Sequence, residues 1–368
     1  MSSVWEFIKR NRGKIVAGGV IVGGLYVARR ALAGPQLESP LHESDYLHAQ
    51  ARRHYVFDSN HRTCDASILE LIPTLRGRIL LRFDVESLTE RLKQADLTTE
   101  EKVKLWEQIK VLSFGRILAV GYSYSLLIIA LKSQISILAG QICAGQRDAS
   151  SMADGWWSRL SQLWSGPSGP SNLLVPTVEA SAQQLFLQCI QYFAGQGVDR
   201  LFDRIHALAA EATSAITLKE MMSAVRLTDL LNDIRRKLEG ADYRNFSYLI
   251  VPLSANQDAW SLPHKGHLEA LLNRLHQVLE SEQCQKLTSQ LVDSYVSGVV
   301  EFCDSHGASG SVPMARLIPT VSDAFHAISS SSFESPAQEA LVSPDLHQFC
   351  MSVFAQDPVI PVSTKSVD

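Results

Sequence analysis

The residue whose surroundings point most clearly to chemistry is Trp106, which lies between Lys102 and Lys110. On a helix with about 3.6 residues per turn, one apolar stripe is formed by Leu105, Ile109 and Leu112. Trp106 falls beside this stripe, so its ring is expected at the edge of the buried face. An indole flanked by lysines can anchor a partner's amphipathic helix with acidic flanks. A tryptophan that packs at the core edge beneath lysine stems would give the same pattern.

Recognised catalytic motifs are absent from the sequence. It contains no phosphate-binding loop, no dinucleotide-binding glycine pattern, no His-Glu-x-x-His and no Gly-x-Ser-x-Gly. His264 and His267 are three residues apart, but they stand beside Pro263 and Gly266 with no cysteine nearby, as ordinary surface histidines do. We therefore expect a binding or assembly role, with no enzyme activity, no cofactor and no metal. The formal net charge of −4 gives no argument for nucleic acid as a partner.

The elements that must position Trp106 are helical. Apolar residues recur three and four residues apart, and Thr98 to Glu101 offer capping hydroxyls and early carboxylates for the helix that carries Trp106. The pattern predicts helices over 44–55, 67–83, 85–94, 117–131, 178–195, 197–216, 219–240, 267–280, 286–304, 313–328 and 343–355. Pro73 could kink the second of these or shift its start. The expected fold is all-α, an elongated bundle of long helices with short connections.

Two stretches interrupt this pattern or imitate another one. The segment from Ile117 to Leu131 is apolar enough to resemble a membrane span, but it contains tyrosines and serines and lacks aromatic and basic flanks, so we expect a buried core helix. Residues 144–176 are rich in glycine, serine and proline and predict a mobile loop. This loop holds Trp156, Trp157 and Trp164. These rings fit either a turn packed on the body or an element that touches lipid or a partner.

The N-terminal segment, residues 1–33, predicts a membrane anchor followed by a folded body over 34–368. An uncharged run of about 14 residues extends from Ile15 through Val22 to Ala28. It would cover roughly 21 Å as a helix, so flanking basic side chains must extend to the headgroups for it to span. The basic residues before it are Lys9, Arg10, Arg12 and Lys14, which should attract anionic lipid.

A cleaved secretory signal is the alternative reading of this segment. Ala31-Leu32-Ala33 looks like a cleavage site, and Asn245 begins a glycosylation sequon. Arg29 and Arg30 argue against cleavage because they separate the apolar run from that site. The six cysteines are scattered, mostly within apolar helical patterns, which is typical of free thiols. Protease protection and glycosylation assays separate the two readings.

Eight stretches in order along the chain resemble the peroxisomal biogenesis factor 3 (peroxin-3) family. They are Ser3–Arg10, Ala49–Tyr55, Ser59–Cys64, Leu71–Arg76, Glu86–Thr89, Leu105–Lys110, Ser113–Arg116 and Ala315–Pro319. The resemblance is strongest from Ser3 to Cys143, and the tryptophan-containing loop departs from the family pattern.

The resemblance implies a protein of the peroxisomal membrane with a short N-terminal anchor and a helical cytosolic domain. Its expected partners are membrane lipid and peroxin-19, the soluble receptor for newly made peroxisomal membrane proteins, whose N-terminal amphipathic helix would occupy a hydrophobic groove at the membrane-distal end. By motif matching, Trp106 corresponds to the central groove tryptophan. The other groove positions implied are Thr89, Leu92, Lys102, Arg316 and Ile318, and Lys110 is the second lysine flanking Trp106. A membrane-tethered helical enzyme and a secreted helical protein remain the alternatives.

Overall fold

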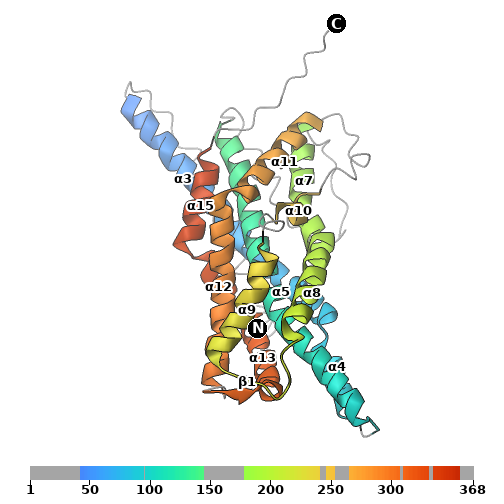
Figure 1. Ribbon diagram of the computed structural model, residues 1–368. Helices are drawn as coiled ribbons and strands as arrows, with labels where there is room; N and C mark the ends of the chain where they lie inside the picture. Colours follow the sequence, from blue (N-terminus) through green and yellow to red (C-terminus); the bar gives the residue numbers. More distant parts are fainter. Residues whose placement is uncertain are drawn as a thin grey trace, which may run out of the picture.

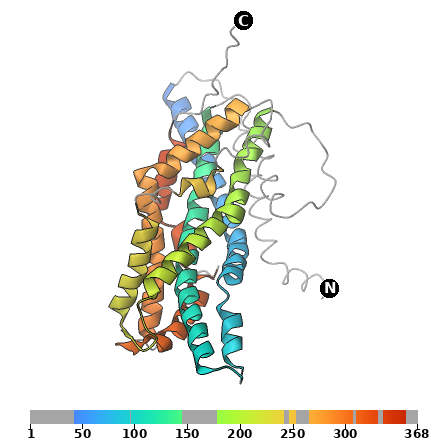
Figure 2. The ribbon, with the colours of Figure 1, turned by 45° about the vertical axis from the view of Figure 1, so that its right-hand side comes forward.

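The computed structural model describes residues 42–94, 96–144, 178–240, 246–252, 265–306, 310–330 and 335–356. The predicted anchor, the loop over 144–176 beyond Ala144, His264 and the sequon asparagine Asn245 lie outside these residues. Within them the protein is a helical bundle with one short strand pair, which confirms the predicted all-α class. Figures 1 and 2 show long helices running side by side around α5 (Thr99–Ala144).

The longest helices, α3 (His42–Arg82) and α5, pack against each other along the bundle. The sequence predicted two helices before residue 83, but the structure has one continuous helix with Pro73 inside it. Ile72 and Leu75 are buried beside the proline, while Pro73 itself is exposed. The carbonyl that a proline leaves unpaired can then bond to water, and packing of the neighbouring residues keeps the helix intact.

The middle of α5 is the core of the molecule. One helical segment, Thr99–Gln141, is long and apolar enough to cross a membrane, but its most apolar window is 100% buried inside the protein. The apolar segment from Ile117 to Leu131 is therefore a core helix, as predicted. The helices that pack against α5 include α3, α8, α12, α13 and α15.

The remaining helices surround α5. They are α4 (Val85–Leu92), α7 (Val178–Tyr192), the π-helix η1 (Phe193–Gly197), α8 (Val198–Thr213), α9 (Ala224–Leu238), α10 (Ser247–Ile250), α11 (Lys265–Glu280), α12 (Glu282–Ser305), α13 (Met314–Ile328), α14 (Pro336–Leu341) and α15 (Pro344–Phe354). The sequence did not predict η1, α10 or α14. A Cβ on Gly197 would lie 2.0 Å from the carbonyl oxygen of Leu249, so the close approach of α10 to η1 requires glycine there.

A two-stranded antiparallel pair, β1 (Met221–Met222) and β2 (Val312–Pro313), replaces the start of the helix predicted over 219–240. The N–H of Met314 also donates to the carbonyl of Glu220 at 2.8 Å. The helix begins later because the Ser223 hydroxyl caps α9 by accepting from the Arg226 N–H at 3.3 Å. Pairing with a distant segment thus overrides the local helical pattern.

All six cysteines are free thiols, as expected, and five of them are buried. Burial raises the pKa of the Cys189, Cys284 and Cys350 thiols to about 12, so these groups stay protonated and unreactive near neutral pH. They serve as small apolar core residues.

Candidate partner-binding site

Trp106 lies in the first turns of α5, which pack against α4. These two elements are at the end of the molecule opposite the start of α3 (Figures 1 and 2). Asp84 caps α4 by accepting from the Ser87 N–H at 2.9 Å. The start of α5 is a reciprocal capping box, in which the Thr98 N–H donates to the Glu101 carboxylate at 2.8 Å and the Glu101 N–H donates to the Thr98 hydroxyl at 3.3 Å. Hydrogen bonds from Thr98 lower the pKa of Glu101.

The indole of Trp106 sits at the edge of the buried face, where the helical wheel placed it. Leu105 and Ile109 are buried, whereas Trp106 is half-buried and packs on the outside of the core. Val103, one turn earlier, is 48% exposed. The sequence analysis did not single out Val103, although its spacing of three from Trp106 was a usable signal.

Lys110, the second lysine that flanks Trp106 in the sequence, is buried in the structure. It is 1% exposed, its ammonium donates to the Ile216 carbonyl at 2.6 Å, and it pairs with Glu107 one turn earlier. Its long stem crosses apolar surface to reach the segment after α8, where a carbonyl and a carboxylate satisfy the charge. Lys102, by contrast, is exposed.

On α4, Leu88 and Leu92 are half-buried against the core. Thr89 is exposed, and its hydroxyl donates to the Val85 carbonyl at 2.8 Å. Leu88, Leu92, Trp106 and Val103 are therefore apolar side chains left partly or largely uncovered on two helices that pack together. We call these four residues the tip surface.

The two predicted wall residues on α13 have different environments. Arg316 is exposed, whereas Ile318 is 1% exposed and belongs to the core. Ile318 lies on the inward face of α13 with Leu317 and Val321, so it supports the wall and is not presented to a partner. The segment between α8 and β1 bridges α5 and α13, because Ile216 accepts from Lys110 and the Leu218 carbonyl accepts from the Ala315 N–H at 3.0 Å.

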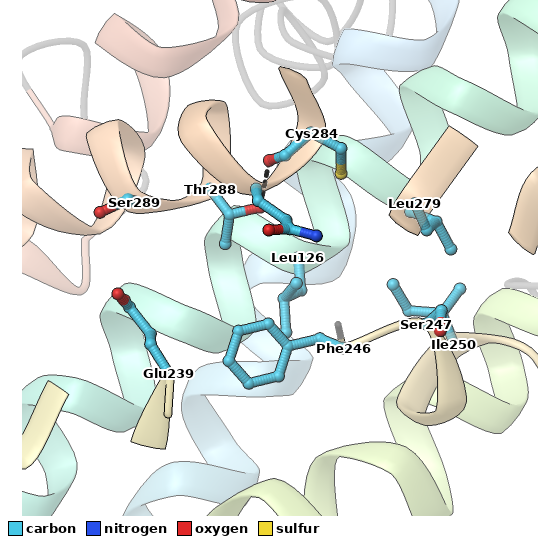
Figure 3. Close-up of a pocket in the computed structure, with 10 residues that line it drawn as sticks. Leu126, Glu239, Phe246, Ser247, Ile250, Leu279, Cys284, Thr288 and Ser289 are labelled. Atoms are coloured by element: carbon cyan, nitrogen blue, oxygen red, sulfur yellow. Dashed lines mark hydrogen bonds between the residues drawn. The ribbon is translucent and has the colours of Figure 1, made fainter. Parts of the chain in front are cut away.

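Two cavities among the described residues lie away from the tip surface. The first, of about 220 Å³, is lined by apolar side chains that include Leu126, Phe246 and Ile250 and by polar ones that include Glu239 and Thr288 (Figure 3). The Thr288 hydroxyl is already used, since it donates to the Cys284 carbonyl at 2.8 Å.

The second cavity, of about 210 Å³, is lined by charged and polar residues of α3 and α5 and by residues of α14 and α15 that include Leu341 and His347. Two contacts are formed by its lining residues: Lys132 pairs with Asp65 at 2.5 Å, and the His61 ring lies 3.1 Å from the Ser136 hydroxyl. Burial, Lys132 and His347 lower the pKa of His61 to about 3, so the ring is neutral. Structural ion networks also perturb pKa values. Among the described residues no group of three or more histidine, cysteine or acidic side chains is arranged to hold a metal ion.

The fold and the tip surface together define a class: a helical scaffold with uncovered apolar side chains, an exposed lysine and an exposed arginine at one end. The sequence matches the Peroxin-3 family over residues 6–102 and 94–356. The chain belongs to this family, which confirms the resemblance found in the sequence.

Named relatives agree with the family assignment. The peroxisomal biogenesis factor 3 of Rattus norvegicus is 27% identical over 384 residues, covering 96% of this chain and 97% of the relative. That of Homo sapiens is 27% identical over 385 residues with the same coverage of both chains. The peroxisome biogenesis protein 3-1 of Arabidopsis thaliana is 23% identical over 297 residues, covering 78% of this chain and 77% of the relative. All three are named for peroxisome biogenesis rather than for an enzyme activity.

Proposed function

We propose that this protein is a docking factor for peroxin-19 at the peroxisomal membrane, where it serves insertion of membrane proteins and peroxisome biogenesis. The observation that carries the proposal is that Trp106 is only partly buried, as are Leu88 and Leu92 of the neighbouring α4, with the exposed Val103 and Lys102 on the same turns of α5. Membership of the peroxin-3 family supplies the cellular context.

An amphipathic helix fits this surface by chemistry. Its apolar face would cover Trp106, Leu92, Leu88 and Val103, which water meets in the free protein. Acidic residues beside that face would lie near Lys102 and, towards α13, near Arg316. Charges at the rim of an interface chiefly increase the association rate and the specificity.

Position along the chain supports an orientation. The predicted anchor over residues 1–33 precedes α3, and the start of α3 and the tip surface lie at opposite ends of the bundle (Figure 1). We propose that residues 1–33 hold the chain in the peroxisomal membrane as a single span, with the helical body in the cytosol. The tip surface would then face away from the membrane, towards a soluble receptor.

Titration with an N-terminal peptide of peroxin-19 tests the proposal. Trp106→Ala should weaken binding at least about tenfold, since about 1.4 kcal/mol corresponds to a factor of ten and truncating a central aromatic anchor costs 2 kcal/mol or more. Tyr55→Ala is the matched control, because it removes a partly exposed aromatic ring on α3 near the opposite end of the molecule. Equal affinities of the Trp106→Ala and unmodified proteins would refute the proposed function.

A further inference from the structure

We propose that Arg116 is a positioning residue for the tip surface, because its buried guanidinium joins α4 and α13 to α5 without itself reaching the surface. The inference rests on the proposed function and assigns a role to two family-like motifs, Glu86–Thr89 and Ser113–Arg116, which docking alone does not explain.

The corner between α3 and α4 is fixed to α5 immediately beside Arg116. Phe83 directly follows α3 and is fully buried, and its ring meets that of Phe202 edge-on with centroids 5.6 Å apart. A Cβ on Gly115 would lie 2.6 Å from Phe83 Cε1, so the ring packs directly on the glycine backbone. The start of α4 is therefore seated on α5 at residues 115 and 116.

Arg116 then ties both neighbouring helices to this point. It is 0% exposed; Nη1 donates to Glu86 Oε1 of α4 at 2.8 Å, and Nη2 donates to the Ser322 hydroxyl of α13. The guanidinium also lies over the Phe325 ring of α13, with Cζ 4.4 Å from the centroid. The same two helices carry Leu92 and Arg316, on the two sides proposed for docking.

The contacts of Arg116 with α4 and α13 depend on the charge of Glu86. A buried guanidinium is costly unless it is paired, and Glu86 is the carboxylate paired with it. Arg76 and Asp323 also act on the guanidinium, with opposite charges. Arg76 Nη2 lies 3.0 Å from His326 Nδ1, and His326 Nε2 is 3.8 Å from Glu86 Oε1. If the Glu86 charge is removed, the first turn of α4 loses its tie to α5. Leu92 lies six residues further along the same short helix and would shift relative to Trp106.

Glu86→Gln in the full-length chain, purified in mild detergent, tests this with an N-terminal peroxin-19 peptide as the probe. Asp293→Asn is the matched control, because Asp293 is also a half-exposed carboxylate paired with a buried arginine, Arg235, on helices away from the tip surface. We expect Glu86→Gln to weaken peptide binding three- to tenfold and to speed amide exchange in α4. Asp293→Asn should lower thermal stability comparably while changing affinity less than twofold.

A double variant separates this inference from the proposed function. In the Trp106→Ala background, Glu86→Gln should change peptide affinity less than twofold, because both substitutions affect the same contact between Trp106 and the peptide. Unchanged affinity for Glu86→Gln, with Trp106→Ala still weakening binding, would overturn the positioning role and leave docking intact. Equal losses of peptide affinity for Glu86→Gln and Asp293→Asn would overturn it too, because both would then reflect general destabilisation of the fold. Unchanged affinity for Trp106→Ala would instead remove the proposed function.

Discussion

The two halves of α5 differ in what covers them. From Ser113 to Ala139 every residue is buried, and the helices that pack against α5 include α3, α8 and α12. From Thr99 to Leu112, the same helix keeps Leu105 and Ile109 inside while Trp106 and Val103 remain partly or largely uncovered. The half from Ser113 to Ala139, the covered half, is fully buried by the protein's own fold. The half from Thr99 to Leu112 is not, and a partly exposed apolar surface of this kind is typical of a binding site.

The largest expected effect is a loss of folding stability on substitution in the covered half of α5. Leu127 is 0% exposed in the covered half, so Leu127→Ala should reduce the free energy of unfolding by about 2–5 kcal/mol. Urea denaturation measures this. The affinity of the folded variant for the peroxin-19 peptide should be within twofold of that of the unmodified protein. A large loss of affinity would contradict the assignment of binding to the other half alone.

Lys110 lies at the boundary between the halves and should behave as a core residue. Lys110→Met keeps most of the stem but leaves the Ile216 carbonyl and Glu107 without their partner. The expected loss is about 1–3 kcal/mol of unfolding free energy, seen as a lower denaturation midpoint. Full stability combined with weak peptide binding would instead place Lys110 in the docking surface.

Acid should destabilise the covered half through His61. Its pKa is lowered to about 3 in the folded protein from 6.5, by burial and by Lys132 and His347. Between these two pH values His61 is protonated in the unfolded chain but neutral in the folded one. The free energy of unfolding therefore falls as the pH drops below about 6.5. Between pH 7 and pH 5 this contributes about 1–2 kcal/mol. His61→Gln should flatten that part of the stability profile, and an unchanged profile would count against the assignment.

The smallest effect belongs to the exposed lysine beside Trp106. Lys102→Met should weaken peptide binding about two- to threefold at low salt, with no measurable change in unfolding free energy. The difference should disappear near 1 M salt because the charges are then screened. A salt-independent loss would mean that Lys102 contributes by packing rather than by charge.

Local periodicity predicted much of the fold because apolar spacing reports which face of a helix is buried. It located α4, α11, α12, α13 and α15 closely and identified the apolar middle of α5 as core. It failed where contacts between distant residues decide the outcome. The Met221–Met222 strand depends on residues 312–313, and continuation of α3 through Pro73 depends on the packing around it.

The candidate site was predictable to the same extent. The wheel placed Trp106 at the core edge correctly, because that position follows from local helical geometry. It could not show that Lys110 turns inward, because the acceptor is the carbonyl of Ile216, more than a hundred residues away. The burial of Ile318 and the Arg116–Glu86 contact likewise needed the arrangement of α13 and α4 against α5.

Hydrogen–deuterium exchange with and without the peroxin-19 peptide tests the central claim most directly, since it locates the bound helix on the free surface. The account predicts slower exchange in α4 and in the first turns of α5 around Trp106, with no change in the start of α3 around Tyr55. Protection confined to the α3 end, or bound peptide without any protection of α4 and α5, would contradict it.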